Sequence, residues 1–150
     1  MLNILRVFHV FIPFLTIASQ DFTLVLDSIN VTSISITKNQ QTLYVGTNNG
    51  LLIHDIEKQK TNIFHLSNGL IDEEITSILC QKNGVVWIGS KSGLISFNGS
   101  DFSYYTIGFD NNSNHIRSLL IDYEENLWIG THSGLYKYRG KGFTVYDRQY

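Results

Sequence analysis

Histidines are the side chains of this chain most suited to acid–base or metal chemistry, because imidazole titrates near neutral pH and ligates transition metals. The chain has five of them, namely His9, His54, His65, His115 and His132. No two have the His-Glu-x-x-His spacing that places two metal ligands on one helical face. We therefore expect each histidine to be a surface or loop residue, and we expect no enzymatic activity and no cofactor.

Carboxylate and amide oxygens offer a second chemistry, the coordination of calcium. Asp110, Asn112 and Asn114 have the alternate spacing that opens a calcium-binding loop. His115, however, stands where such a loop needs glycine, and Ile121 stands where it needs a bidentate carboxylate. The segment is therefore expected to be a polar connecting loop without a metal.

The acidic run "IDEE" at residues 71–74 and the single cysteine, Cys80, are the other groups that could react. Neighbouring carboxylates on a loop do not converge on one point, so we expect them to be solvated. One cysteine permits neither an intrachain disulfide nor a zinc site built from several thiolates. Cys80 ends an apolar run beside Leu79, which predicts a small buried residue.

The composition is that of a folded domain without a nucleic-acid surface. Hydrophobic residues make up 43 % of the chain and charged residues 16 %, which supplies enough apolar material for a core. The formal net charge is -2, and no run of Lys and Arg is present. Since a phosphate backbone requires a basic surface, nucleic acid is excluded as an expected partner.

The first twenty residues, 1–20, have the pattern of a secretory signal peptide. Arg6 precedes a mostly apolar run over residues 7–18, and small or polar residues follow. That run has the length of a signal-peptide core and is shorter than the ~20 residues of a membrane span. The alternative is a buried N-terminal strand or helix; His9 and Pro13 interrupt the run and count against a signal peptide and a helix alike. We expect the leader to be removed and the remainder to be periplasmic or secreted, with no transmembrane anchor.

The rest of the sequence is organised by an internal repeat. "GVVWIGSKSGLISF" at residues 84–97 recurs in similar form as "ENLWIGTHSGLYKY" at residues 125–138, and a weaker copy lies upstream. Successive copies are 43 and 41 residues apart. Each copy contains an aromatic residue followed by two glycines, which we call the first and the second glycine of the repeat. These residues are Tyr44, Gly46 and Gly50 in the first copy, Trp87, Gly89 and Gly93 in the second, and Trp128, Gly130 and Gly134 in the third.

Each repeat holds four short runs rich in Ile, Val, Thr, Tyr, Phe and Trp, separated by turn residues, which is typical of four antiparallel strands. One such sheet has two apolar faces and must bury both, and a ring of similar sheets, the β-propeller, achieves this. We therefore predict an all-β fold over residues 21–150, an incomplete β-propeller of about three four-stranded antiparallel blades plus one extra outer strand. The blades are expected at about residues 31–66, 75–106 and 116–147, and the extra strand at 22–26.

The repeated residues have distinct expected roles. The second glycine of each repeat lies in a hairpin turn, where a positive φ costs glycine little. The first glycine lies inside a strand, where the missing side chain indicates the close approach of another backbone or a bulky ring. Trp87 and Trp128 recur at one strand position, so we expect core residues wedged towards the next blade rather than platforms that stack on sugars.

These units resemble the two-component regulator propeller repeat, whose pattern is an "I-x-S-I" strand, a polar turn, "L-W-I-G-T-x-x-G-L-x-x-Y" and an "F-x-x-Y" strand. Residues 116–147 follow this pattern almost throughout and residues 75–105 nearly as well, whereas the first unit has Tyr44 and Val45 in place of Trp-Ile and one inserted residue. The resemblance covers about residues 22–147. Members of this family are usually the periplasmic sensor part of bacterial hybrid histidine kinases or of diguanylate cyclases, and several sense oligosaccharides. The resemblance therefore implies a ligand-binding part of a signal-transduction sensor.

Three blades do not close a propeller, which needs about four or more. One hypothesis is a truncated or split product of a longer sensor gene, since no kinase or cyclase motif is present. A second is a stand-alone binding module that completes a propeller by oligomerisation, and a third is a structural envelope protein without a small ligand. The first two hypotheses require further propeller blades, from the same or another chain, as partners.

The geometry of a blade predicts where a ligand would bind. The connections between blades and the turns between second and third strands emerge at one end, and loops on a rigid scaffold often carry binding residues. Their amide-rich side chains suit the hydroxyls of a small ligand such as an oligosaccharide, although any solvated loop shares this composition. The ligand-binding candidates are Asn48, Asn49, Asn68, Asp72, Lys91, Asp110, Asn112, His115, Arg117 and His132.

Overall fold

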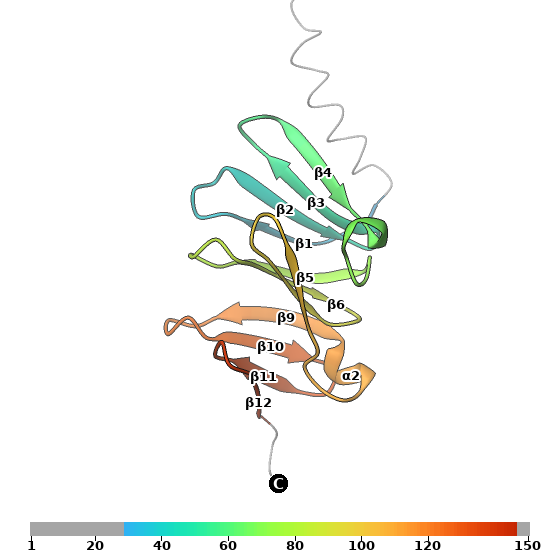
Figure 1. Cartoon of the computed structure of the whole chain (residues 1–150), viewed down its shortest axis with the longest axis vertical. Helices are drawn as coiled ribbons and strands as arrows, with labels where there is room; N and C mark the ends of the chain where they lie inside the picture. Colours follow the sequence, from blue (N-terminus) through green and yellow to red (C-terminus); the bar gives the residue numbers. More distant parts are fainter. Residues whose placement is uncertain (1–28, 147–150) are drawn as a thin grey trace, which may run out of the picture.

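The computed structural model describes residues 29–146, which form three four-stranded sheets that follow one another along the molecule (Figure 1). In each sheet the strands lie in chain order, and every neighbouring pair is antiparallel. The prediction of an all-β, incomplete propeller is confirmed. The first sheet consists of β1 (Val31–Ile36), β2 (Thr42–Thr47), β3 (Gly50–Asp55) and β4 (Lys60–Phe64); the second of β5 (Ile75–Cys80), β6 (Val86–Ser90), β7 (Leu94–Phe97) and β8 (Phe102–Tyr105); the third of β9 (Ile116–Ile121), β10 (Leu127–Thr131), β11 (Leu135–Tyr138) and β12 (Phe143–Tyr146).

Two short helical segments connect the sheets, where the sequence predicted only loops. The 3-10 helix η1 (Leu66–Asn68) lies between the first and second sheets, and α2 (Asn111–Asn114) lies between the second and third. The residue inserted in the first unit lies in the β1–β2 turn. One residue more separates the paired Ile36 and Leu43 than separates the equivalent pair, Cys80 and Val86, in the second sheet. The predicted signal peptide at 1–20 and the predicted extra strand at 22–26 lie outside the described residues.

The middle sheet is apolar on both faces because it is covered on both. On β6, Val86 and Ile88 belong to the core shared with the first sheet, whereas Trp87 between them belongs to the core shared with the third. This follows from the alternation of side chains along a strand. The period-two pattern of the sequence therefore builds two cores, one on each side of the second sheet.

The first strands of successive sheets lie side by side, with β1 against β5 and β5 against β9. Serine hydroxyls join β1 to β5: Ile78 N donates to Ser33 Oγ at 2.9 Å, and Cys80 N donates to Ser35 Oγ at 3.1 Å. Backbone donors that β5 does not use within its own sheet are satisfied in this way. The small polar residues of β1 therefore fix the position of one sheet against the next.

The first glycine of a repeat forms a socket for the following sheet. A Cβ on Gly46 would lie 2.6 Å from Cγ2 of Ile75, and a Cβ on Gly89 would lie 2.4 Å from Cγ2 of Ile116. Both isoleucines are completely buried. The expectation of a backbone or a ring at these positions is therefore wrong: the occupant is the β-branched side chain that begins the next sheet.

The two tryptophans differ in their surroundings. Trp87 is 6 % exposed, and its ring lies 5.6 Å from that of Tyr138 in the third sheet, measured between centroids. Trp128 is only half-buried, and its ring lies 4.9 Å from that of Tyr146 in its own sheet. Within residues 29–146 no fourth sheet follows the third. Trp87 thus occupies the wedge position predicted for both, whereas Trp128 lies on the outer face of the third sheet.

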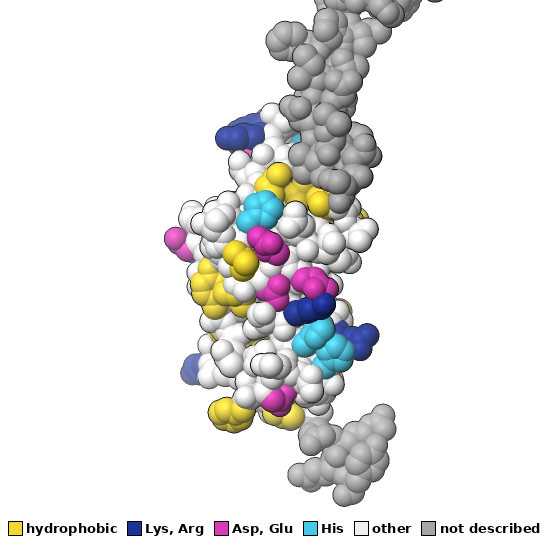
Figure 2. Space-filling view, turned by 90° about the vertical axis from the view of Figure 1, so that its right-hand side faces the viewer, with side chains coloured by type: hydrophobic (Ala, Val, Ile, Leu, Met, Phe, Trp, Pro, Cys, Tyr) yellow, Lys and Arg dark blue, Asp and Glu magenta, His cyan; other side chains and the backbone are white. Residues whose placement is uncertain are grey.

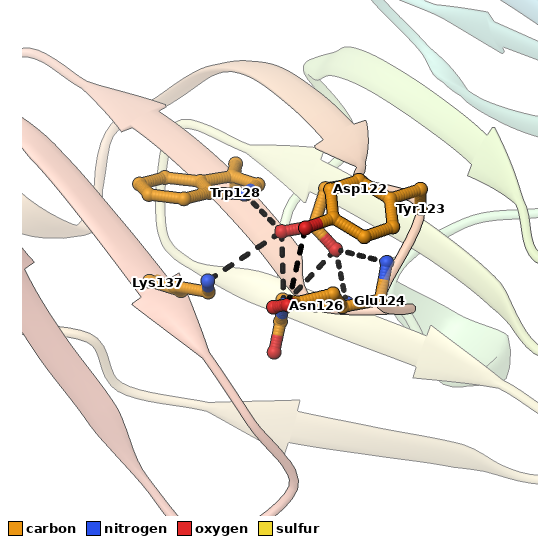
Figure 3. Close-up of polar contacts among 6 residues, drawn as sticks. All are labelled: Asp122, Tyr123, Glu124, Asn126, Trp128 and Lys137. Atoms are coloured by element: carbon orange, nitrogen blue, oxygen red, sulfur yellow. Dashed lines mark hydrogen bonds and ion pairs between the residues drawn. The ribbon is translucent and has the colours of Figure 1, made fainter.

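Asp122 closes the β9–β10 turn and holds the indole of Trp128 (Figure 3). Its carboxylate accepts hydrogen bonds from Trp128 Nε1 at 2.8 Å and from Asn126 N at 2.9 Å. Lys137 Nζ lies 3.5 Å from Asp122 Oδ2 and 4.6 Å from the centroid of the Trp128 ring. Burial raises the pKa of the Asp122 carboxyl, but the hydrogen bonds from Asn126 and Trp128 outweigh burial and hold it well below its ordinary value. In the second sheet, Gln81 Oε1 takes the same role by accepting from Trp87 Nε1 at 3.0 Å.

Asp122→Asn is expected to lower the melting temperature at neutral pH, because the amide loses the charge and one of the two acceptor oxygens. A carboxyl whose pKa is lowered on folding stabilises the fold fully above its unfolded pKa of about 3.9. This contribution begins to fall below that pH and is lost completely only below the folded pKa. The difference in melting temperature between parent and variant should therefore be largest near neutral pH and shrink towards about pH 3. Thermal unfolding by circular dichroism measures it; a difference independent of pH would contradict this role.

Candidate ligand-binding face

Five segments meet at one end of the three sheets, and we call their surface the loop face. They are the connections 65–74 and 106–115, which contain η1 and α2, and the turns 48–49, 91–93 and 132–134. Figure 2 views the molecule from the side on which η1 and α2 lie in Figure 1, and shows acidic, basic and histidine side chains gathered along the middle of this face. The loop face is therefore a charged and polar surface supported by strands.

Each hairpin turn on the loop face is closed by the hydroxyl that ends the second strand of its sheet. Thr47, Ser90 and Thr131 donate to the carbonyl oxygen three residues later, at 2.8, 3.0 and 3.0 Å. The same oxygens accept from the backbone N–H two residues later, at 3.0, 3.2 and 3.1 Å. The second glycine of each repeat has the predicted positive φ, at +114°, +151° and +145°. The three turns therefore share one hydrogen-bonding pattern.

Two aspartates join the connections to these turns. Asp72 accepts from Ser92 Oγ at 2.8 Å, and Asp110 accepts from Ser133 Oγ at 3.3 Å. Asp110 also caps α2 by accepting from Ser113 N and Oγ at 2.8 and 2.9 Å. These bonds from Ser113 hold the pKa of Asp110 below its ordinary value. Both candidates therefore shape the loop face by fixing each connection to the following turn.

In each sheet, the residue before the first strand lies beside the first residue of the hairpin turn, and we call these two residues a turn pair. The first pair is joined by a backbone N–H that donates to an amide oxygen at 3.1 Å, and the second is an ion pair of 2.6 Å. The third consists of two imidazole rings whose centroids are 4.0 Å apart and whose planes cross at 87°. The three turn pairs are Asn30–Asn48, Glu74–Lys91 and His115–His132.

The second and third turn pairs influence each other electrostatically. Burial lowers the pKa of His115, and the charges of His132, Lys91 and Arg117 lower it further, while Glu74 opposes them. A cation near an imidazole disfavours its protonation. The His115 ring is therefore neutral at neutral pH, with one nitrogen able to donate and one able to accept a hydrogen bond.

The other four candidates do not belong to turn pairs. Asn68 closes η1, because its Nδ2 donates to Ile63 O at 3.0 Å and its Oδ1 accepts from His65 N. The remaining three are exposed: Asn49 and Asn112 lie on the loop face, and Arg117 lies in β9, next to it. The structure therefore brings four of the predicted residues into turn pairs, and these are Asn48, Lys91, His115 and His132.

One expectation about titratable groups is wrong, and another needs an addition. The "IDEE" carboxylates are engaged rather than simply solvated: Glu73 Oε1 lies 3.5 Å from His65 Nδ1, in addition to the contacts of Asp72 and Glu74 above. His54 is not a surface residue, since it is 7 % exposed within β3 and its Nδ1 lies 2.9 Å from Thr61 Oγ1. The acidic connection is thus part of the packed frame of the loop face.

The opposite end of the sheets carries a hollow of about 490 Å³ between the β1–β2 and β5–β6 turns. Cys80 lines it and is half-buried, which departs from the expected burial. Burial raises the pKa of the Cys80 thiol. A protonated thiol is a poor nucleophile, so this end has no activated cysteine.

Neither a metal centre nor a membrane helix is found in the described part of the chain. Among residues 29–146, no three His, Cys, Asp or Glu side chains come together as metal ligands would. Asn114, from the segment with calcium-like spacing, instead accepts from Ile107 N at 2.8 Å and donates to Gly108 O at 2.9 Å. No helix between residues 29 and 146 has the length and apolar character of a membrane span.

One protein-family model matches this chain, in two places. The "Two component regulator propeller" model matches residues 69–92 and 110–133. Each match begins in a connection of the loop face and ends in the following hairpin turn, so it contains the first two strands of the second or the third sheet. No curated protein matches the chain.

Solved structures share the fold over most of this chain. The extracellular domain of a putative one component system from B. thetaiotaomicron has 25 % identity and a TM-score of 0.71, and the match covers 79 % of this chain and 17 % of that one. The extracellular domain of a putative hybrid two component system from B. thetaiotaomicron has 23 % identity and a TM-score of 0.70, with 81 % and 17 % covered. Virginiamycin B lyase from Staphylococcus aureus, inactivated and crystallised with quinupristin, has 10 % identity and a TM-score of 0.67, with 81 % and 42 % covered. At 23 % and 10 % identity, the hybrid-system domain and the lyase show the fold alone.

The repeat, the sheets and the comparisons agree with one another. The match spans only 17 % of the length of each of the two B. thetaiotaomicron chains. This chain has the propeller fold of these extracellular domains, and two of its segments match the two-component regulator propeller repeat.

Proposed function

We propose that this chain is the ligand-sensing propeller portion of a bacterial two-component regulatory sensor, located in the periplasm or outside the cell, and that it binds a small polar molecule such as an oligosaccharide without catalysing a reaction. The observation that carries the proposal is the set of turn pairs. Turns with one hydrogen-bonding pattern present an amide pair, an ion pair and an imidazole pair at equivalent positions of three sheets. A repeated frame with varied side chains is suited to recognition.

The chemistry of the turn pairs favours a ligand rich in hydroxyl groups. Amide, carboxylate, ammonium and imidazole groups together offer both donors and acceptors, and a hydroxyl is both. Backbone hydrogen bonds hold two of the three pairs together, from His132 N to His115 O at 3.1 Å and from Asn48 N to Asn30 O at 3.2 Å. Binding to fixed groups loses less side-chain entropy than binding to free ones. An oligosaccharide long enough to contact two sheets would therefore gain from both pairs.

The test is isothermal titration calorimetry of the purified chain with short neutral and uronic-acid oligosaccharides. Lys91→Gln and His132→Gln, one from each of two turn pairs, are each expected to weaken binding about tenfold, the usual cost of a lost charged or buried hydrogen bond. Lys38→Gln is the matched control, because Lys38 lies at the opposite end, in the β1–β2 turn. Absence of binding by every oligosaccharide, or equal weakening by the control, would contradict the proposal.

A further inference from the structure

Apolar side chains are exposed at both ends of the row of sheets. On β1, Val31 is 49 % exposed and Ile34 is 65 % exposed. On the third sheet, Leu120 is 62 % exposed and Leu135 is 40 % exposed. Apolar surface of this kind in a folded chain indicates an interaction site.

The exposed residues of β1 hold positions that are buried in the next sheet. Val31 and Ile34 have the same pairing with β2 that Ile75 and Ile78 have with β6, including the same irregularity one residue after the start of the strand. Ile75 is completely buried and Ile78 is 7 % exposed, because both pack against the first sheet. The face of β1 is therefore the same kind of surface as the face of β5, without a sheet from residues 29–146 upon it.

The outer face of the third sheet has the complementary shape. At Gly130 lies an open hollow of about 240 Å³, lined by Ser118, Leu119, Leu120, Trp128, Gly130 and Leu135. Gly130 holds the place of Gly46 and Gly89, whose sockets are filled by Ile75 and Ile116. Near Gly130, the closest atom to an added Cβ is Ser118 Oγ of the same sheet, at 2.5 Å. The socket of the third sheet is thus formed, and within residues 29–146 no side chain from a following sheet fills it.

We propose that a second copy of this chain docks its β1 on the outer face of the third sheet, with Val31 entering the hollow at Gly130. The contact repeats the one between the first and second sheets. Ser118 holds the place of Ser33, so its Oγ would accept from Ile34 N of the second copy as Ser33 Oγ accepts from Ile78 N at 2.9 Å. The contact is head-to-tail, and it rests on the sheet faces rather than on the proposed ligand site.

A second copy of this chain has the surface that fits each of the two end faces. Both halves of the contact are present on one chain, and the same kind of contact already occurs twice within it, at Gly46 and at Gly89. A head-to-tail contact between two copies forms a closed ring when both contacts are made. Such a ring would hold six sheets, which lies within the range of about four to eight blades found in propellers.

The oligomeric state is measured by sedimentation velocity of the purified chain over a dilution series. The expected result is a reversible dimer. A monomer at every concentration, or a polymer that grows without limit, would overturn the proposal. A monomer would also indicate that further blades of a longer chain, rather than a second copy, cover these faces.

Two substitutions test the two halves of the contact separately. Ile34→Asp and Leu120→Asp place an unpaired carboxylate in the contact, and each is expected to raise the dissociation constant of the dimer about a hundredfold. Both side chains are mostly exposed, so folding is retained, as far-ultraviolet circular dichroism would verify. Phe109→Asp is the matched control, because Phe109 is 112 % exposed in the connection between the second and third sheets, away from both end faces.

Mixing the two variants gives the sharpest result. In a head-to-tail dimer, the intact β1 of the Leu120→Asp chain still fits the intact third sheet of the Ile34→Asp chain. The mixture is therefore expected to form a one-to-one complex at concentrations where each variant alone is monomeric. A mixture that stays monomeric, or single variants that still dimerise as the parent does, would overturn the head-to-tail contact.

Discussion

Trp87→Ala is expected to lower the free energy of unfolding by about 3 to 5 kcal/mol, the usual cost of emptying a large aromatic site in a core. The Trp87 ring lies between two sheets, 5.5 Å from the ring of Tyr105 and 5.6 Å from that of Tyr138, and its Nε1 donates to Gln81. Its loss leaves a cavity between the second and third sheets and an amide oxygen without its donor. Urea unfolding followed by far-ultraviolet circular dichroism measures the change.

Trp128→Ala is the matched control, because it removes the same side chain from the same place in the next repeat. Trp128 is half-buried on the outer face of the third sheet, so we expect a smaller loss of about 1 to 2 kcal/mol at concentrations where the chain is monomeric. Equal losses for the two variants would contradict the placement of Trp87 between sheets.

Gly89→Ala is expected to have the second largest effect, a loss of about 1 to 3 kcal/mol through overpacking. The new Cβ would lie 2.4 Å from Cγ2 and 2.9 Å from Cβ of Ile116. Ile116 is β-branched and completely buried, so it cannot rotate away, and the third sheet must move. The same unfolding measurement applies.

Gly130→Ala provides the comparison for Gly89→Ala. There the nearest atom to the new Cβ is Ser118 Oγ, at 2.5 Å, and a serine side chain can change rotamer. We expect a change within about 0.5 kcal/mol for the monomeric chain. If Gly130→Ala destabilises as much as Gly89→Ala, the glycines do not act as sockets between sheets.

The sequence predicted the sheets correctly because two independent periods agree in it. Alternation of apolar residues sets each strand, and the 43- and 41-residue spacing of Gly46, Gly89 and Gly130 sets the succession of sheets. The second glycine of each repeat was also predictable, since its positive φ is a local property of the turn. Local and periodic features are thus the ones that one sequence reveals.

Features that depend on contacts between repeats could not be predicted in the same way. The occupant of the Gly89 socket is Ile116, which no local pattern identifies. The turn pairs join residues far apart in the sequence, such as His115 and His132. The hydroxyls that close the hairpin turns could have been predicted from the sequence, because Thr47, Ser90 and Thr131 each follow the first glycine of a repeat.

The most direct test of the proposed sensing function is to map a bound oligosaccharide on the chain by nuclear magnetic resonance. Backbone amide signals of the isotopically labelled chain are followed while an oligosaccharide that binds in calorimetry is added. We predict that the signals that shift belong to the turns 48–49, 91–93 and 132–134 and to the residues that pair with them. Shifts confined to the hollow at the opposite end, around residues 37–39 and 80–86, or to the outer face of the third sheet would contradict a binding site on the loop face.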